Sequence, residues 1–174
     1  MRRKVSDRLA LGAVGAAVSL VFVILAYYVP NMKVSFNALA SFGTMLPLLK
    51  GYYREAALSS IATIVIGIFL VNVSILPFAL VGGLYTIATV FAENKKLKLY
   101  ITVPVKLAYA AFLFFVFYRL ASLIVVDFSR LGVIGTWPFG AVYAVMTVVF
   151  CLAFSVYDFV LILCYRYVKQ RFNI

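Results

Sequence analysis

The sequence predicts an all-α integral membrane protein, a compact bundle of six transmembrane helices that forms one domain over residues 1–174, with the N and C termini cytoplasmic. Composition is the first reason. Hydrophobic residues make up 66% of the chain and charged residues 12%, with a mean hydropathy of +1.11, whereas average usage includes about 25% charged residues. The second reason is six apolar runs that approach or exceed the roughly 20 residues a helix needs to cross the hydrocarbon core. The third is the placement of the basic residues.

The basic residues gather at alternate ends of the predicted spans. The net charge is +11, from sixteen lysines and arginines against five acidic residues, a balance that in a soluble protein indicates nucleic-acid binding. Twelve fall at the ends predicted to be cytoplasmic: Arg2, Arg3, Lys4, Arg8, Lys50, Arg54, Lys95, Lys96, Lys98, Arg166, Lys169 and Arg171. Two, Lys33 and Arg130, fall in the opposite loops, and the other two lie within a span. This positive-inside asymmetry indicates topology rather than nucleic-acid binding.

The first three predicted spans cover residues 9–29, 34–49 and 56–73. Pro30 ends the first span, because proline is common just beyond the end of a helix. The second span is short and carries several polar residues, so a re-entrant segment is the alternative for it. That alternative would move the later loops to the other side of the membrane, against the positive-inside pattern.

The last three predicted spans cover residues 76–92, 101–126 and 138–165. The fifth span is long enough to tilt in the bilayer. Residues 127–137 form the longest outer loop, and the sixth span returns the chain to the cytoplasm.

The first span is sorted by side-chain size. At 3.6 residues per turn, Gly12, Ala13, Ala16, Ala17 and Ser19 fall in one band. The pairs Gly12/Ala16 and Ala13/Ala17 have the small-xxx-small spacing that lets membrane helices approach closely. Two interpretations stay open: packing inside the chain's own bundle, and a docking face for a different membrane protein.

Three ionisable residues at the inner side of the spans form a predicted buried charge cluster. Lys106 lies in the fifth span, Asp158 in the sixth and Glu93 at the end of the fourth. A charge within the membrane is costly, so each needs a partner or a purpose. A structural pair that fixes helix register and a proton relay are the two alternatives. The absence of histidine disfavours the relay.

Polar and aromatic residues near the outer side are candidates for binding a small molecule. Arg119 can hold a carboxylate or phosphate group bidentately, or it can extend to the headgroups. Tyrosine and tryptophan at this depth are also typical of the interfacial belt. The candidate substrate-binding residues are Tyr28, Asn31, Asn37, Asn72, Arg119, Asp127, Arg130 and Trp137.

No recognisable catalytic or cofactor motif occurs in the sequence. Without histidine there is no Ser-His dyad and no histidine metal site. A Walker loop, a dinucleotide-binding glycine turn and a CxxC pair are also missing. Cys151 and Cys164 are expected to be small buried hydrophobes. We therefore expect no enzyme activity, no cofactor and no metal.

The sequence resembles the substrate-binding S components of energy-coupling factor vitamin transporters, and little-characterised S-component-like proteins of Gram-positive bacteria. The resemblance covers the whole chain as architecture and short patches as sequence. These patches are the Ala13/Ala17 pair, VPNMKVSF at 29–36, the stretch from GGLYT at 82–86 to Glu93, and VYDF at 156–159.

The resemblance implies a subunit of the bacterial plasma membrane that captures a vitamin-like molecule in an outward pocket, built by the outer loops and the last three spans. It also implies that the Ala13/Ala17 face docks on a transmembrane coupling subunit driven by two ATPases. No single vitamin's binding pattern matches the outer residues. A non-transporting membrane scaffold with the same fold, as in MreD-like proteins of the cell-shape machinery, is the alternative.

Overall fold

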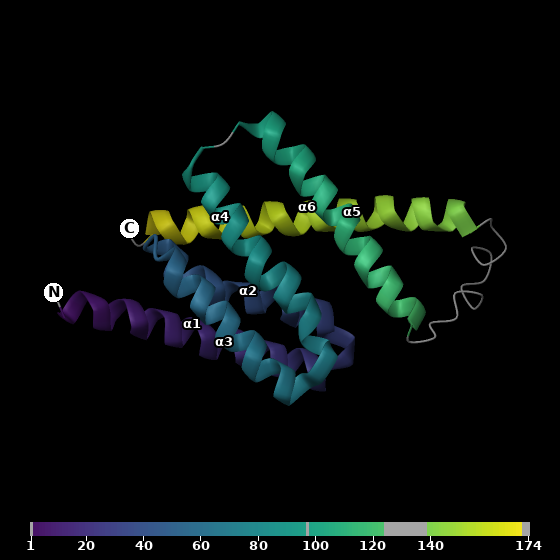
Figure 1. Ribbon diagram of the computed structural model, residues 1–174. Helices are drawn as coiled ribbons and strands as arrows, with labels where there is room; N and C mark the ends of the chain where they lie inside the picture. The colour runs from purple at the N-terminus through teal and green to yellow at the C-terminus, as the bar shows by residue number, and fades with distance from the viewer. Residues whose placement is uncertain (1, 97, 124–138, 172–174) are drawn as a thin grey trace. The chain divides into compact units, whose positions relative to one another are not determined.

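The computed structural model describes residues 2–96, 98–123 and 139–171 (Figure 1). Within these ranges the chain is helical between short turns and contains no strand, which confirms the all-α prediction. The elements in chain order are α1 (Arg2–Tyr28), a 3₁₀ turn (Pro30–Met32), α2 (Lys33–Leu49), α3 (Tyr53–Val71), a second 3₁₀ turn (Asn72–Ile75), a π-helix (Phe78–Tyr85), α4 (Thr86–Asn94), α5 (Leu99–Leu123) and α6 (Phe139–Arg171).

Four segments are long and apolar enough to cross a membrane: Ser6–Tyr28, Tyr53–Ile75, Tyr100–Arg119 and Val142–Arg171. They indicate a multi-pass membrane protein. The other two predicted spans correspond to shorter helices. α2 has 17 residues, and Phe78–Asn94 is an apolar helix of 10–17 residues. Six crossings and cytoplasmic termini therefore stay predictions.

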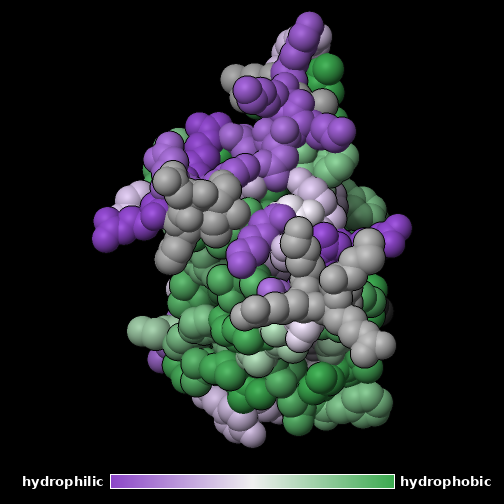
Figure 2. All heavy atoms as spheres, turned by 90° about the vertical axis from the view of Figure 1, so that its left-hand side faces the viewer, coloured by the Kyte–Doolittle hydropathy of each residue, from purple (hydrophilic) through white to green (hydrophobic). Residues whose placement is uncertain are grey.

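The outer surface of the helices is strongly apolar. On α3, Ile61, Val65 and Phe69 form an exposed stripe at helical spacing, and Phe69 is 85% exposed. Figure 2 shows hydrophobic side chains over much of the visible face. Apolar patches of this extent are unusual on water-soluble monomers, and lipid chains are the solvent that suits them.

The chain divides into two compact units. The first comprises Met1–Lys96 and Leu161–Ile174, and the second comprises Leu97–Val160. The first unit therefore contains α1 to α4 together with the last turns of α6, and the second contains α5 with the rest of α6.

Two clusters of buried apolar side chains hold the first unit together. One joins the last turns of α1, the middle of α2, the end of α3, the second 3₁₀ turn and the start of the π-helix, through Val23, Ala40, Val71, Ile75 and Phe78. The other joins the end of α2, the start of α3, α4 and the last turns of α6, through Met45, Leu48, Leu49, Ala56, Val90 and Tyr165. The ends of α1 and α3 thus lie at one end of the unit, and the start of α3 lies at the other.

α1 and α2 touch through their backbones where Gly15 faces Gly43. A Cβ atom added to Gly15 would lie 2.5 Å from the carbonyl oxygen of Gly43, and one added to Gly43 would collide with Ser19 and with the Gly15 carbonyl. Across the same interface Ser19 Oγ donates a hydrogen bond to the Ala40 carbonyl at 2.8 Å. Small residues at a crossing and hydroxyl bonds between helices are the usual means of association in lipid.

A π-helix follows the second 3₁₀ turn, where the sequence predicts an ordinary span. It contains Gly82 and Gly83, and a Cβ added to Gly82 would lie 2.5 Å from Cδ2 of Phe78. Thr44 of α2 lies 2.8 Å from the Gly82 carbonyl with its Oγ1. Gly82 thus leaves room for the Phe78 ring, and its carbonyl lies beside Thr44 of α2.

The second unit is an α5–α6 hairpin with an aromatic seam. The ring of Phe114 packs against Tyr143 at 5.4 Å and Phe150 at 5.5 Å between centroids, and Phe150 stacks on Phe154 at 6.2 Å. Aromatic rings bury large areas with preferred geometry, so this seam fixes how the two helices pack.

Candidate functional site

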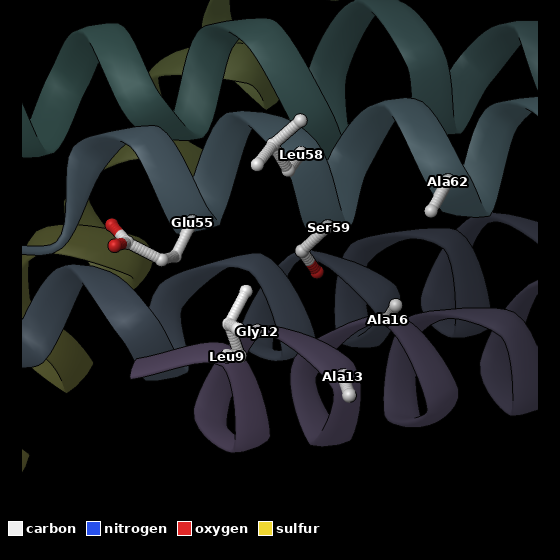
Figure 3. Close-up of a pocket in the computed structure, with 8 residues that line it drawn as sticks. All are labelled: Leu9, Gly12, Ala13, Ala16, Glu55, Leu58, Ser59 and Ala62. Atoms are coloured by element: carbon white, nitrogen blue, oxygen red, sulfur yellow. The ribbon is translucent and has the colours of Figure 1, made fainter. Parts of the chain in front are cut away.

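A small groove opens between α1 and α3 on the first unit (Figure 3). Its volume is about 180 Å³. We call it the α1–α3 groove, and its lining residues are Leu9, Gly12, Ala13, Ala16, Glu55, Leu58, Ser59 and Ala62. Gly12, Ala13 and Ala16 of the predicted small-residue face therefore line one concave surface.

The structure divides the small-residue face of α1 between two roles. Gly12 and Ser19 are buried inside the first unit, whereas Ala13 and Ala17 are exposed and Ala16 is half-buried. A Cβ added to Gly12 would lie 3.4 Å from the Glu55 carbonyl oxygen, so α1 and α3 are close at the floor of the groove. One side of the face packs the bundle, and the other side remains open on the surface.

The open side of α1 extends beyond the groove, toward the C-terminal end of the helix. Ala17, Val18, Val21 and Phe22 line a second apolar hollow of about 250 Å³. Ala17 thus lines this hollow and not the groove. The other exposed alanine, Ala13, lies one helical turn away and lines the groove.

Ser59 forms part of the groove wall and has a buried hydroxyl that faces Gly15. Its side chain is 3% exposed, and its Oγ atom has no hydrogen-bond partner among the described residues. Figure 3 shows the hydroxyl pointing from α3 toward α1. The neighbouring hydroxyls of α3 behave differently: Ser60 donates to the Ala56 carbonyl at 2.9 Å, and Thr63 lies 2.9 Å from the Ser59 carbonyl.

Glu55 brings a carboxylate to the start of α3, at one end of the groove. It is half-buried and forms no ion pair within the described part of the chain. Among the other acidic residues, Glu93 pairs with Arg166 at 2.6 Å and Asp158 pairs with Lys106 at 2.7 Å. A half-buried carboxylate without a cation is therefore a distinguishing feature of the groove.

The predicted charge cluster is distributed over the two units. In the second unit Lys106 Nζ lies 2.7 Å from Asp158 Oδ2, with side chains 21% and 16% exposed. This pair joins α5 to α6, as a register-fixing pair would. In the first unit Glu93 pairs with Arg166 of α6, whose side chain is largely exposed.

Five of the eight predicted substrate-binding residues lie within the described ranges. In the first unit Tyr28, Asn31 and Asn72 are exposed, and buried Asn37 donates from Nδ2 to the Lys33 carbonyl, one turn earlier in α2, at 2.8 Å. The second unit holds Arg119, which is exposed with its guanidinium 5.3 Å from the Phe115 ring centre. Asp127, Arg130 and Trp137 lie outside the described residues.

Sequence reasoning did not single out four residues that shape this region. They are Gly15 and Gly43 at the α1–α2 crossing, and Glu55 and Ser59 in the groove. Gly15 and Ser19 do have small-xxx-small spacing, and Glu55 is one of only five acidic residues in a basic chain. Those two patterns were available in the sequence, but neither says which helix packs opposite.

The groove offers close packing, one carboxylate and one hydroxyl. Within the described ranges no three His, Cys, Asp or Glu side chains are grouped to hold a metal ion. Comparison with protein-family models, with curated proteins and with solved structures found no match for this chain.

Proposed function

We propose that this chain is the substrate-binding membrane subunit of an importer of the energy-coupling factor type. In this proposal it captures a vitamin-like small molecule on the outer side and docks on a transmembrane coupling subunit through α1. It has no catalytic role of its own. The α1–α3 groove is the observation that carries the docking part, and the sequence resemblance supplies the identity of the partner.

Helix association in lipid explains why the groove supports docking. Apolar faces gain nothing from leaving water there, so association depends on close packing and hydrogen bonds. The buried Gly12 forms a low floor, and the exposed Ala13 adds only a methyl group to the rim. A second helix can therefore approach the α1 backbone more closely here than along the large exposed side chains of α3.

The basic residues of the first unit support an orientation in which the end that holds the start of α3 faces the cytoplasm. Lys50, Arg54 and Lys95 lie at the end where α2 and α4 finish and α3 begins, whereas Lys33 lies at the opposite end. By the positive-inside rule the first end is cytoplasmic. Glu55 then lies on the side where an ATPase-driven coupling subunit would receive energy.

Co-purification tests the proposal. The full chain, carrying an affinity tag, is expressed with an ATPase-bearing coupling module and extracted in mild detergent. We expect the module to be retained by the unaltered chain and lost with Ala13→Leu, since Ala13 is exposed and the larger side chain obstructs the groove without entering the core. Ala153→Leu makes the same change at an exposed position of α6 and should retain the module.

A ligand screen tests the other half of the proposal. The purified chain is heated with each member of a vitamin panel, and a binding compound raises the unfolding temperature because it stabilises only the folded state. Absence of a shift with every compound, together with no retention of the module, would reject the importer role.

A membrane scaffold is the second candidate, and one observation favours it. Several buried hydroxyls of the first unit are used for packing: Ser19 bonds the Ala40 carbonyl and Thr44 reaches the Gly82 carbonyl. Such an interior suits a rigid interaction protein. For a scaffold, Ala13→Leu would disturb a membrane partner that has no ATPase, and no vitamin would alter the unfolding temperature.

A further inference from the structure

The α1–α3 groove contains two polar groups that the first unit leaves unused, the Glu55 carboxylate and the Ser59 hydroxyl. We propose that the groove receives a membrane-spanning helix of a partner protein that presents one lysine or arginine to Glu55 and a hydrogen-bond acceptor to Ser59. This inference rests on the docking role proposed above and specifies the chemistry of the docked helix.

The cation follows from charge complementarity. Glu55 is half-buried among Leu9, Leu58 and small residues, and it forms no ion pair within the described ranges. Two acidic residues that the structure describes elsewhere, Glu93 and Asp158, each have a basic partner at hydrogen-bond distance. A carboxylate at the edge of an apolar groove attracts a cation more strongly than one surrounded by water, because the local dielectric constant is lower.

The acceptor follows from the unsatisfied hydroxyl. Buried hydroxyls in helices usually bond the carbonyl of the preceding turn, as Ser60 and Thr63 do on the same helix. Ser59 Oγ does not, although it is covered by protein and lies in the wall of the groove. A buried donor without a partner costs free energy. Ser59 Oγ faces Gly15, so docking relieves this cost only when the hydroxyl turns toward an oxygen on the docked helix.

The spacing of the two groups constrains the partner. Glu55 and Ser59 are four residues apart on α3, which is about 6 Å along the helix axis at 1.5 Å per residue. The docked helix should therefore carry its cation and its acceptor about one turn apart. Its contact face should also consist of small residues, because Gly12, Ala13, Ala16 and Ala62 leave little room beside them.

Designed single-span peptides provide the test. The host peptide is a leucine–alanine helix with an alanine face and a serine as acceptor, and one residue a turn away is lysine, glutamine or glutamate. Each peptide is reconstituted with the full chain in phosphatidylcholine vesicles, and energy transfer between dyes on the two molecules reports association. The net charge of +11 on the chain favours the glutamate peptide, so a preference for lysine requires a local site.

We expect the lysine peptide to associate about fivefold more tightly than the glutamine peptide, as for a partly exposed ion pair. Glu55→Gln should remove that preference. Asp7→Asn changes the net charge of the chain equally at an exposed residue outside the groove, and should retain it. Ser59→Ala should weaken all three peptides about threefold, the usual effect of one hydrogen bond between membrane helices.

Three results would overturn the inference. The first is equal binding of the three peptides, with Ala13→Leu still abolishing association. The second is no association of any peptide. The third is self-association of the chain that Ala13→Leu disrupts, which would make a second copy the occupant. If the unaltered chain prefers the lysine peptide but does not retain the ATPase module, only the importer role is rejected.

Discussion

Gly15 of α1 and Gly43 of α2 lie against each other with no room for a side chain on either. A Cβ on Gly15 would be 2.5 Å from the Gly43 carbonyl oxygen, and a Cβ on Gly43 would collide with the Gly15 carbonyl. The contact joins two helices whose remaining interface includes the Ser19 hydroxyl bond to the Ala40 carbonyl. Backbone atoms on both helices form this contact, so a side chain here has no flexible neighbour to displace.

Gly43→Ala should destabilise the protein by about 1–3 kcal/mol, because the added methyl group meets backbone atoms that cannot rotate away. Thermal unfolding in detergent, followed by circular dichroism, measures the loss. Gly12→Ala is the matched control, since its Cβ would meet only ordinary contacts at 3.4 Å and beyond. Equal unfolding temperatures for the two variants would contradict the close α1–α2 crossing.

Thr44→Val should remove the bond between α2 and the π-helix while keeping the shape of the side chain. Thr44 is fully buried, and its Oγ1 lies 2.8 Å from the Gly82 carbonyl and 2.7 Å from the Ser41 carbonyl of its own helix, so the two acceptors share one hydroxyl proton. We expect a loss of about 0.6–1.5 kcal/mol. Thr147→Val is the control, because Thr147 donates only to Tyr143 one turn earlier in its own helix. The unfolding temperatures of the two variants are compared, and an equal loss of stability in both would contradict the prediction.

Asp158→Asn should destabilise the α5–α6 hairpin by about 2–3 kcal/mol, since it leaves the Lys106 ammonium without its anion in an apolar span. The double variant Lys106→Met/Asp158→Leu should recover most of that loss, because no charge remains to be compensated. Thermal unfolding of the single and double variants measures both effects. A proton relay, by contrast, would lose proton-coupled activity in the double variant although stability returned.

Glu93→Gln is the control for the part-buried Lys106–Asp158 pair. Arg166 is 63% exposed on its side chain, and exposed ion pairs contribute about 0–1 kcal/mol. A loss as large as that of Asp158→Asn would show that the two pairs do not differ in this way.

Lys95→Cys should be labelled by a membrane-impermeant maleimide only after the membrane is opened, whereas Asn31→Cys should be labelled in intact cells. Both positions are exposed, and the basic end of the first unit is expected inside. Cys151 and Cys164 are replaced by serine in each variant so that no other thiol reacts. Labelling of Lys95→Cys from outside would reverse the orientation and the assignment of the outer residues.

Much of the helical arrangement was predictable from the sequence because its causes are local. The apolar runs over 9–29 and 56–73 correspond to α1 and α3, and Pro30 marks the end of α1. The outcome of the Lys106–Asp158 prediction is also instructive. Lys106 and Asp158 have opposite charges and lie at similar depths in neighbouring spans. An unpaired charge within the membrane is costly and few other partners are present in these spans, so their pairing could be predicted from the sequence.

The site was predictable only in part. Periodicity places Gly12, Ala13, Ala16 and Ala17 in one band, but it does not say where that band meets another helix. The π-helix at Phe78–Tyr85 also lacks a sequence rule, because it depends on the packing of the Phe78 ring and on the contact with α2.

By itself the sequence determined that this is a helical chain suited to lipid, since composition and apolar run length act through the solvent and need no knowledge of neighbours. Only the tertiary structure decided which small residues are interior and which are open. It placed Gly15 against Gly43, and it set Ser59 and Glu55 beside the exposed Ala13. Which groups remain unpartnered depends on the atoms of other helices, and those distances exist only in the folded chain.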